Sequence, residues 1–360
     1  MKRLPSRYNC LLAVYKPAGM SSHDCINALR RALGERRIGH AGTLDPLAQG
    51  LLVCGVGVAT RLLPYVTARQ KTYLADICFG CETTTDDAEG TPTKSAAPHA
   101  QLTNPAYAQR ILAQFLGDIQ QVPPIYSAIS KNGVRSYNAA RNGVAFELEA
   151  RPVHVYSAEL VGITTPDSSI TTDSPITTDS PAQPVWRVRF CVSKGTYIRS
   201  LARDIGRCAN SAAHLSFLER TSSGALDASC ALTLSELEAC AHAEAACAGV
   251  SRHAHGPMQE FLAAHMLNPL VAASLTRYNV TDCEHAAMER GIPFAARSCG
   301  FAACIDDRTA DAAAPNTQAA DDAHYVGCVQ HSTLYGVYRY NDGMLTCAVN
   351  VLQGIDGAGV

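Results

Sequence analysis

The chain has 360 residues, of which 47% are apolar and 17% are charged. This composition excludes a fully disordered chain and favours a globular protein with a large core and two domains, since domains usually hold about 100 to 200 residues. The net charge is −2, but residues 1–220 hold 24 Lys and Arg against 17 Asp and Glu, whereas residues 221–360 hold 6 against 15. The basic first part, with 24 Arg among the 30 basic residues of the chain, suits phosphate contacts, although a codon bias toward Arg explains it equally well.

The beginning of the chain predicts neither a signal peptide nor a membrane span. Its apolar run at 11–15 ends at Lys16 and Pro17, which is too short for either. The 15 cysteines are an odd number scattered through the chain, so we expect reduced thiols, and the lone C-x-x-C at 78–81 lacks the second pair of a zinc site. We therefore expect a cytoplasmic protein with no membrane association and no metal.

The predicted elements of the first hundred residues alternate between strands and one helix. Residues 10–15 predict a strand, and a helix follows with Ser22 as its N-cap and Gly34 at its end. Residues 51–56 are apolar throughout, which is typical of a buried strand. Residues 71–79 alternate between apolar and polar, which predicts a strand with one buried face.

Further along, a helix is predicted to open at Asn104 and to close at Gly117. Residues 185–192 alternate again, with Trp186 directed inward, and residues 198–208 have helical periodicity. The order of strands and helices shows no regular βαβ repeat. We therefore predict the α+β class.

Several segments are predicted to lie outside the regular structure. Residues 163–183 contain the hexapeptide ITTDSP twice in tandem, which indicates a flexible insertion between two strands. A break is expected near 251–269 and disorder at 306–322. Short apolar pieces spaced by turn residues within 268–360 predict a small β-rich C-terminal domain.

Residues 37–50 form the strongest candidate site. The segment has three glycines, one proline and one carboxylate, Asp45, directly before the predicted buried strand. Such a loop lets backbone pass close to a ligand and can hold one Asp rigidly. An Asp-Pro pair after Thr is more often a turn former than a catalyst, so composition alone leaves both interpretations open.

Two long motifs carry a resemblance to a known family. Residues 16–22 (KPAGMSS) and 40–48 (HAGTLDPLA) together resemble the paired signature of TruB-type tRNA pseudouridine synthases. The likeness covers roughly residues 9 to 225. Further matches follow in the family's order at KTY (71–73), TDDAEG (85–90), QVPPIYSA (121–128), RPV (151–153) and SKGTYIRS (193–200).

The resemblance implies a set of site residues. Asp45 corresponds to the catalytic aspartate, Tyr73 to the tyrosine that stacks on the flipped uracil and assists proton removal, and Arg199 to the arginine that pairs with Asp45. His40 corresponds to the histidine that inserts into the T loop, and Leu218 to a leucine that packs in the site. An arginine beside a buried carboxylate favours its ionised form, which this chemistry needs.

The resemblance also implies RNA contacts beyond the reacting base. It places the family's thumb at about 121–149, where basic and aromatic residues are interleaved. Two departures from the family, Ser130 in place of Lys and Glu219 in place of Arg, put specific RNA contacts in question. The further substrate-contacting residues implied are Lys16, Gly42, Tyr126, Lys131, Lys194 and Tyr197.

The family's organisation implies a pseudouridine synthase catalytic domain with a mixed sheet at 1–250 and a small β-rich, PUA-like RNA-binding domain at 268–360. Its reaction converts uridine-55 in the T loop of tRNA to pseudouridine after base flipping, without a cofactor. The expected partner is the T arm of tRNA, with no obligatory protein partner and a monomeric state. Two alternatives stay open: a tRNA-binding and folding factor that does not chiefly use catalysis, and a synthase that acts on another RNA.

Overall fold

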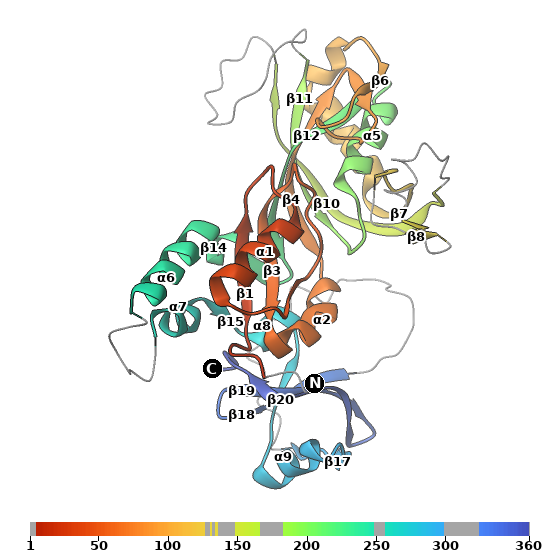
Figure 1. Ribbon diagram of the computed structural model, residues 1–360. Coiled ribbons are helices and arrows are strands. Elements are labelled where there is room, and N and C mark those ends of the chain that lie inside the picture. Colours follow the sequence, from red (N-terminus) through yellow and green to blue (C-terminus); the bar gives the residue numbers. More distant parts are fainter. Residues whose placement is uncertain are drawn as a thin grey trace.

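The computed structural model describes residues 5–126, 130–131, 134–135, 148–165, 183–247, 256–298 and 324–359. Within these ranges an 11-stranded mixed sheet forms the body of the protein, in the order β14-β1-β3-β12-β4-β11-β10-β7, with three short strands added at β1, β3 and β12 (Figure 1). The strands are β1 (Leu11–Lys16), β2 (Ile38–His40), β3 (Gln49–Val56), β4 (Lys71–Phe79), β7 (Gly117–Gln121), β10 (Arg151–Thr164), β11 (Val185–Val192), β12 (Ala213–Ser223), β13 (Leu226–Asp227), β14 (Leu232–Thr233) and β15 (Met266–Leu267).

Helices cover parts of this sheet and connect its strands. In Figure 1, α1 lies in front of the sheet, α6 and α7 flank it on one side, and α5 lies at the opposite end near β12. Helices and strands of both orientations share one body, so the predicted α+β class is confirmed. The helices are α1 (Ser22–Leu33), α2 (Leu63–Thr67), α3 (Pro105–Leu112), α5 (Ile198–Cys208), α6 (Leu234–Cys247), α7 (Pro257–His265), α8 (Pro269–Ala273) and α9 (Asp282–Glu289).

The elements with strong periodicity form where the sequence predicts them. Strands β4 and β11 and helix α5 have the predicted bounds. Alternate residues of β4 and β11 are buried, and Trp186 is fully enclosed, with its indole Nε1 donating to Leu102 O at 2.7 Å. Its ring centroid lies 4.5 Å from that of Phe79, so the two strands share one aromatic core contact.

Helix α1 begins one residue earlier than predicted. Its N-cap is Ser21, which makes a reciprocal capping box with Asp24, and Gly34 ends the helix in the left-handed conformation at φ 61°. Ser22 is the first helical residue, and its hydroxyl instead donates to Leu44 O at 2.9 Å. Serine is a favourable N-cap residue, so the sequence alone does not distinguish Ser21 from Ser22. The structure distinguishes them because the Ser22 hydroxyl bonds to the distant Leu44.

The predicted continuation of α3 to Gly117 is wrong. Asn104 caps the helix as expected, but the helix ends at Leu112 and a 3-10 turn, Ala113–Phe115, follows. Leu116 is 47% exposed, and Gly117 adopts φ 86° as it starts β7. The pairing of β7 with β10 therefore outweighs the apolar spacing that favoured a longer helix.

The expected break at 251–269 is also wrong for its described residues. Helix α7 begins at Pro257, β15 pairs antiparallel with β1, and α8 begins at Pro269. The tail of this segment is thus joined to the central sheet. The repeat within 163–183, most of the thumb and the stretch 306–322 lie wholly or mainly outside the described residues.

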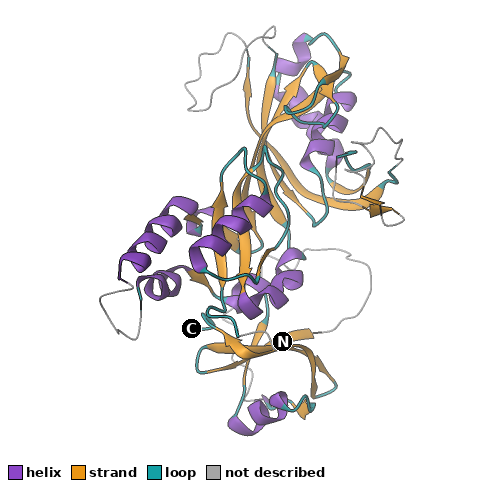
Figure 2. Cartoon of the chain, in the orientation of Figure 1, coloured by secondary structure: helices purple, strands orange, loops and turns teal. Residues whose placement is uncertain are grey.

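Residues 276–355 contain a second sheet, as the predicted β-rich C-terminal domain requires (Figure 2). Its strand order is β16-β18-β19-β20-β17, and α9 follows its first strand. The long strands β18, β19 and β20 lie within 268–360, where the sequence predicts short apolar pieces spaced by turn residues. The bounds are β16 (Thr276–Asn279), β17 (Phe294–Ala295), β18 (His324–Gln330), β19 (Thr333–Asn341) and β20 (Met344–Ile355), and two hairpins elsewhere are β5 (Cys81–Thr83) with β6 (Pro92–Ser95) and β8 (Ser130–Lys131) with β9 (Val134–Arg135).

Strands β1 and β3 are buried on both faces. Leu12 and Val14 belong to the core beneath α1, whereas Leu11 and Ala13 belong to a second core shared with the C-terminal domain. That second core contains Leu334 and other residues of β18 to β20. The C-terminal domain is therefore joined to the central sheet by a continuous apolar core.

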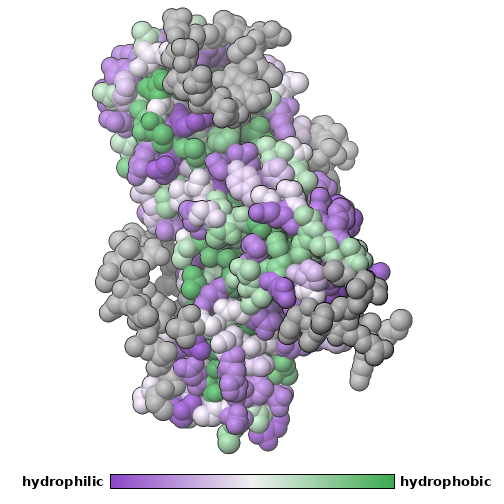
Figure 3. All heavy atoms as spheres, turned by 90° about the vertical axis from the view of Figure 1, so that its left-hand side faces the viewer, coloured by the Kyte–Doolittle hydropathy of each residue, from purple (hydrophilic) through white to green (hydrophobic). Residues whose placement is uncertain are grey.

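The surface on the side of α6 and α7 carries polar and apolar residues in mixture, with apolar residues most frequent over the middle of the face (Figure 3). None of the helices in the described ranges is both long enough and apolar enough to cross a membrane.

The shared core predicts a large stability loss when it is truncated. Replacing the fully buried Leu334 by Ala removes apolar contacts and leaves a cavity, so we expect the free energy of unfolding to fall by about 2 to 5 kcal/mol. Urea denaturation followed by circular dichroism measures this change. Val271→Ala on the adjoining α8, a residue that is 47% exposed, is the matched control and should stay within about 0.5 kcal/mol of wild type.

Candidate active site

The loop between β2 and β3 is held by contacts to β3 and to α1. Ala41 N donates to Val53 O at 2.8 Å, and Leu44 N donates to the Ser22 hydroxyl at 2.8 Å. Gly42 adopts φ 89°, which a residue with a Cβ rarely reaches, and this turn directs the chain toward Asp45. The loop is thus a fixed support for its carboxylate.

Lys16 joins the two long sequence motifs from inside the protein. Its side chain is fully buried, and its ammonium donates to Pro17 O at 2.8 Å, Met20 O at 2.5 Å and Pro46 O at 3.5 Å. Burial lowers the pKa of this ammonium to about 8, and the charge of Asp45 partly opposes the shift. Lys16 therefore ties residues 17–20 to Pro46, the residue after Asp45. Its own side chain is enclosed and has no exposed surface with which to contact RNA.

Asp45 and Arg199 are brought together, as the resemblance implied. Arg199 Nε lies 2.9 Å from Asp45 Oδ2, with the arginine side chain 6% exposed and the aspartate side chain 36% exposed. The N–H direction does not satisfy hydrogen-bond geometry, so Nε has no hydrogen-bond partner among the described residues. The carboxylate therefore has a charge partner behind it and an accessible side in front.

Arg199 is fixed independently of Asp45. Its Nη1 donates to Thr85 O at 3.0 Å and lies 3.5 Å from Asp87 Oδ2, and its Nη2 donates to Tyr126 O at 3.0 Å. Asp87 is 3% exposed, so a second, deeper carboxylate accompanies the buried guanidinium. The positive charge of Arg199 is thus balanced by two carboxylates, the enclosed Asp87 and the accessible Asp45.

Arg199 is the first of three arginines on one face of α5. Residues four apart on a helix lie one above the other, so positions 199, 203 and 207 form a row. Arg203 Nη1 contacts Asp86 Oδ2 at 2.8 Å, and Arg207 binds both carboxylate oxygens of Glu82. This arginine row holds residues 82–87 against α5 and so places Asp87 beside Arg199.

Tyr73 and Leu218 line the buried face of neighbouring strands. Tyr73 is 9% exposed and pairs across the sheet with Phe190 on β11 and Arg220 on β12. Leu218, 6% exposed, pairs with Ala75 and belongs to the same core as Tyr73 and the loop residue Leu44. The two residues are therefore on the sheet face that the Asp45 loop adjoins.

His40 closes β2, opposite Cys54 of β3. It is partly buried. Burial lowers the pKa of the imidazole, and the positive charge of Arg220 lowers it further. A neutral imidazole is therefore the dominant form near pH 7.

The other implied RNA-contacting residues lie around this centre in different settings. Tyr197 is held at the start of α5, where its backbone N–H and C=O pair with the side-chain amide of Gln121 at 2.9 and 3.1 Å. Lys194 is exposed in the loop before α5, and the side chain of Lys131 lies outside the described residues. Glu219, a departure from the family, accepts a hydrogen bond from Tyr15 at 2.9 Å.

Asp87, Gln121 and Arg220 had no role in the prediction from sequence. The first two lie in matched motifs, and the spacing of the arginines at 199, 203 and 207 was a usable signal for a helical row. The partners of Asp87, Gln121 and Arg220 in the site lie 76 to 178 residues away in the chain, so no local sequence pattern indicates which residues pair.

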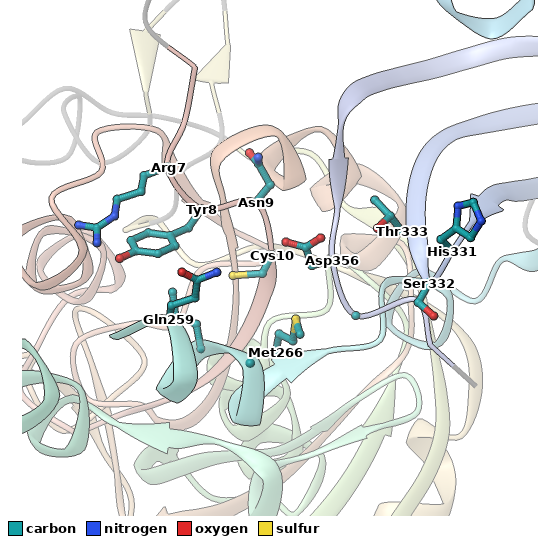
Figure 4. Close-up of a pocket in the computed structure, with 13 residues that line it drawn as sticks. Arg7, Tyr8, Asn9, Cys10, Gln259, Met266, His331, Ser332, Thr333 and Asp356 are labelled. Carbon is teal, nitrogen blue, oxygen red and sulfur yellow. The ribbon is translucent and has the colours of Figure 1, made fainter. Parts of the chain in front are cut away.

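A cavity of about 470 Å³ lies elsewhere, between the N-terminal segment, α7 and the turn between β18 and β19 (Figure 4). Arg7, Asn9, Gln259, His331 and Asp356 are among its lining residues, and none of the residues lining it belongs to the Asp45 loop. No group of three or more His, Cys, Asp or Glu side chains suited to a metal ion occurs in the described part of the chain.

Comparison with solved structures identifies the fold. The protein superimposes on the "Crystal Structure of a Cbf5-Nop10-Gar1 Complex" with a TM-score of 0.60 at 20% identity, over 97% of this chain and 85% of that one. At this identity the likeness establishes the architecture alone. The central sheet and the β-rich C-terminal domain thus have the same arrangement as in that chain.

Comparison of sequences identifies the family. Residues 30–198 match the model "TruB family pseudouridylate synthase (N terminal domain)". The tRNA pseudouridine synthase B of Paenarthrobacter aurescens is 44% identical over 227 residues, 63% of this chain and 68% of its own, and that of Thermobifida fusca is 40% identical over 269 residues, 72% and 86%. The chain belongs to the TruB family of pseudouridine synthases and is an isomerase.

Asp87 is the second carboxylate beside Arg199, and we predict that removing its charge lowers turnover. Asp87→Asn keeps the shape of the side chain but removes one of the two negative charges beside Arg199, so we expect the arginine to move toward Asp45 and kcat to fall about tenfold or more. Single-turnover kinetics measure this effect. Asp76→Asn, which breaks the ion pair with Arg187 on the other face of β4, should leave kcat within about twofold, and equal losses in both variants would contradict the role of Asp87.

Proposed function

We propose that this protein isomerises uridine-55 in the T loop of tRNA to pseudouridine, with Asp45 as its catalytic carboxylate. The observation that carries the proposal is the accessible Asp45 carboxylate 2.9 Å from the buried Arg199 guanidinium. The names of the curated relatives, tRNA pseudouridine synthase B, support tRNA as the substrate. The T-loop position rests on the match of residues 16–22 and 40–48 to the family signature.

The reaction needs an anion near C1′ of the ribose and a pocket for the detached uracil. The C1′–N1 bond breaks, the uracil turns, C5 bonds to C1′, and the proton leaves C5 while N1 gains one. Asp45 serves either as the nucleophile at C1′ or as the electrostatic partner of a cationic sugar. Its exposed side can reach the sugar, because Arg199 approaches it from the protein interior.

Tyr73 is proposed to stack on the uracil and to assist removal of the C5 proton. Its ring lies on the sheet face that also carries Leu218, so both can enclose the base. A uridine in a folded loop must leave its stack first, which costs a few kcal/mol that aromatic stacking offsets. His40, as a neutral imidazole at the end of β2, is proposed to fill the vacated place.

The remaining assignments follow the same resemblance. Residues 1–250 would form the catalytic domain, with the thumb at about 121–149, and residues 268–360 would form a PUA-like module. The core shared between β1, β3 and the C-terminal sheet supports a buttressing role for this acidic module, beside any contact with RNA. We expect the protein to act as a monomer, without a cofactor or an obligatory protein partner.

Tritium release from tRNA labelled with 5-[³H]-uridine tests the reaction. Wild-type protein should release tritium, and Asp45→Asn, which keeps the shape of the side chain and removes its charge, should lower the rate by more than about 1,000-fold. Asp118→Asn, at a side chain that is 74% exposed, is a matched control expected to react as wild type.

Each outcome of that experiment decides between stated alternatives. Binding of tRNA by wild type without tritium release would favour a tRNA-folding factor. Release from tRNA in which uridine-55 is replaced by cytidine, at the rate of the unmodified substrate, would refute the assigned position. Release from another RNA and not from tRNA would identify a synthase with a different substrate.

The role of Tyr73 generates a separate prediction. Tyr73→Phe retains the aromatic face and loses the hydroxyl, so we expect the Kd for a T-arm minihelix to stay within about threefold, while tritium release slows by about 100-fold or more. Fluorescence anisotropy measures binding, and the release assay measures turnover. Unchanged release would show that the hydroxyl takes no part in proton removal.

A further inference from the structure

Arg220 is a buried cation beside the proposed site. It lies near the end of β12 and is only 1% exposed. No carboxylate of the described residues lies within ion-pair distance of its guanidinium, whereas Arg199 has two such neighbours. Burying a cation without a carboxylate is unfavourable, so its retention needs a compensating set of contacts.

Its contacts are to the backbone on both sides of Asp45. Arg220 Nε donates to Leu51 O at 2.7 Å, and its Nη2 donates to Gly42 O at 3.2 Å. Gly42 precedes Asp45 by three residues, and Leu51 follows it by six. One guanidinium therefore spans the two ends of the segment that carries the carboxylate.

The backbone of Arg220 contacts the same segment. A Cβ at Gly50, which adopts φ 103°, would overlap the carbonyl oxygen of Arg220, so the loop approaches β12 as closely as a glycine permits. Gly50 is also the partner of Arg220 in the parallel pairing of β3 with β12. Side chain and main chain of one residue thus fix Gly42, Gly50 and Leu51.

On its other side Arg220 lies next to Tyr73. The two are direct partners in the antiparallel pairing of β12 with β4, and both are buried, so their side chains project from the same face. Opposed residues of this kind have Cβ atoms about 4.5 to 5.5 Å apart. Arg220 therefore lies between the loop of Asp45 and the strand of Tyr73.

We propose that Arg220 is a positioning residue that sets the Asp45 loop against Tyr73 through its paired bonds to Gly42 O and Leu51 O. This inference rests on the proposed roles of Asp45 and Tyr73. Direct contact with RNA is a poor alternative for a side chain that is 1% exposed. The guanidinium of Arg220 is planar and presents donors in fixed directions, which lets it bond to Gly42 O and Leu51 O at the same time.

The decisive variants are Arg220→Lys and Arg220→Gln. Lysine keeps the charge but presents one ammonium in place of the fork, and glutamine keeps a neutral donor. Lys71→Gln is the matched control, because Lys71 is another buried cation whose bonds, within the described residues, go to backbone carbonyls. Those carbonyls are Thr67 O, at 2.6 Å, and Arg69 O, which lie outside the Asp45 loop.

Three measurements separate positioning from general stability. We expect both Arg220 variants to lose about tenfold or more in kcat, with the Kd for the T-arm minihelix within about threefold of wild type. Backbone hydrogen exchange should accelerate at Ala41 and Leu44, whose N–H groups are protected by Val53 O and Ser22. Lys71→Gln should leave kcat and this exchange unchanged, whatever its effect on the melting temperature.

Several outcomes would overturn the inference. Wild-type kcat in Arg220→Lys would show that charge suffices and the fork is not needed. A rise in Kd equal to the loss in kcat would indicate an RNA contact. Equal losses in Lys71→Gln would indicate a general effect of buried charge. If wild type itself releases no tritium, the proposed reaction fails, whereas accelerated exchange in Arg220→Lys would still support the structural link. Circular dichroism confirms that each variant is folded.

Discussion

The arrangement of the site depends on the contacts of one group, the guanidinium of Arg199. It joins α5, to which Arg199 belongs, to three other segments: Asp45 in the loop before β3, Thr85 and Asp87 after β5, and Tyr126 at the base of the predicted thumb. The rest of the arginine row on α5 adds the bonds that hold 82–87 in place. A site gathered from distant parts of the chain is thereby joined at one buried cation.

Buried charge is handled in two ways around this centre. Arg199 is accompanied by carboxylates, one of which remains accessible, so the pair retains a reactive anion. Lys16 and Arg220 are accompanied by backbone carbonyls, which accept hydrogen bonds without adding a negative charge. These two cations, Lys16 and Arg220, hold the loop that carries Asp45 without placing another carboxylate beside it.

Local pattern predicted much of the scaffold and little of the site. The periodicity of β4, β11 and α5 fixed their bounds, because packing on one face selects alternate or helically spaced apolar residues. It failed at the end of α3, where sheet pairing decides the outcome, and at 257–269, where short helices lack a strong apolar stripe. The pair Asp45 and Arg199 was predicted only through resemblance to a family, and Arg220 was missed, because nothing near it in the chain indicates its partners Gly42 and Leu51.

Strands β1 and β3 each contribute alternate residues to two different cores. Each strand therefore packs into two cores, one beneath α1 and one shared with the C-terminal domain. Even-numbered residues belong to the first core and odd-numbered residues to the second. A one-residue insertion in β1 would exchange the two sets of side chains, and both cores would lose their packing together. Transplanting the C-terminal domain from a distant relative would likewise require matching changes at every second residue of these strands, so the two domains are bound to change in concert.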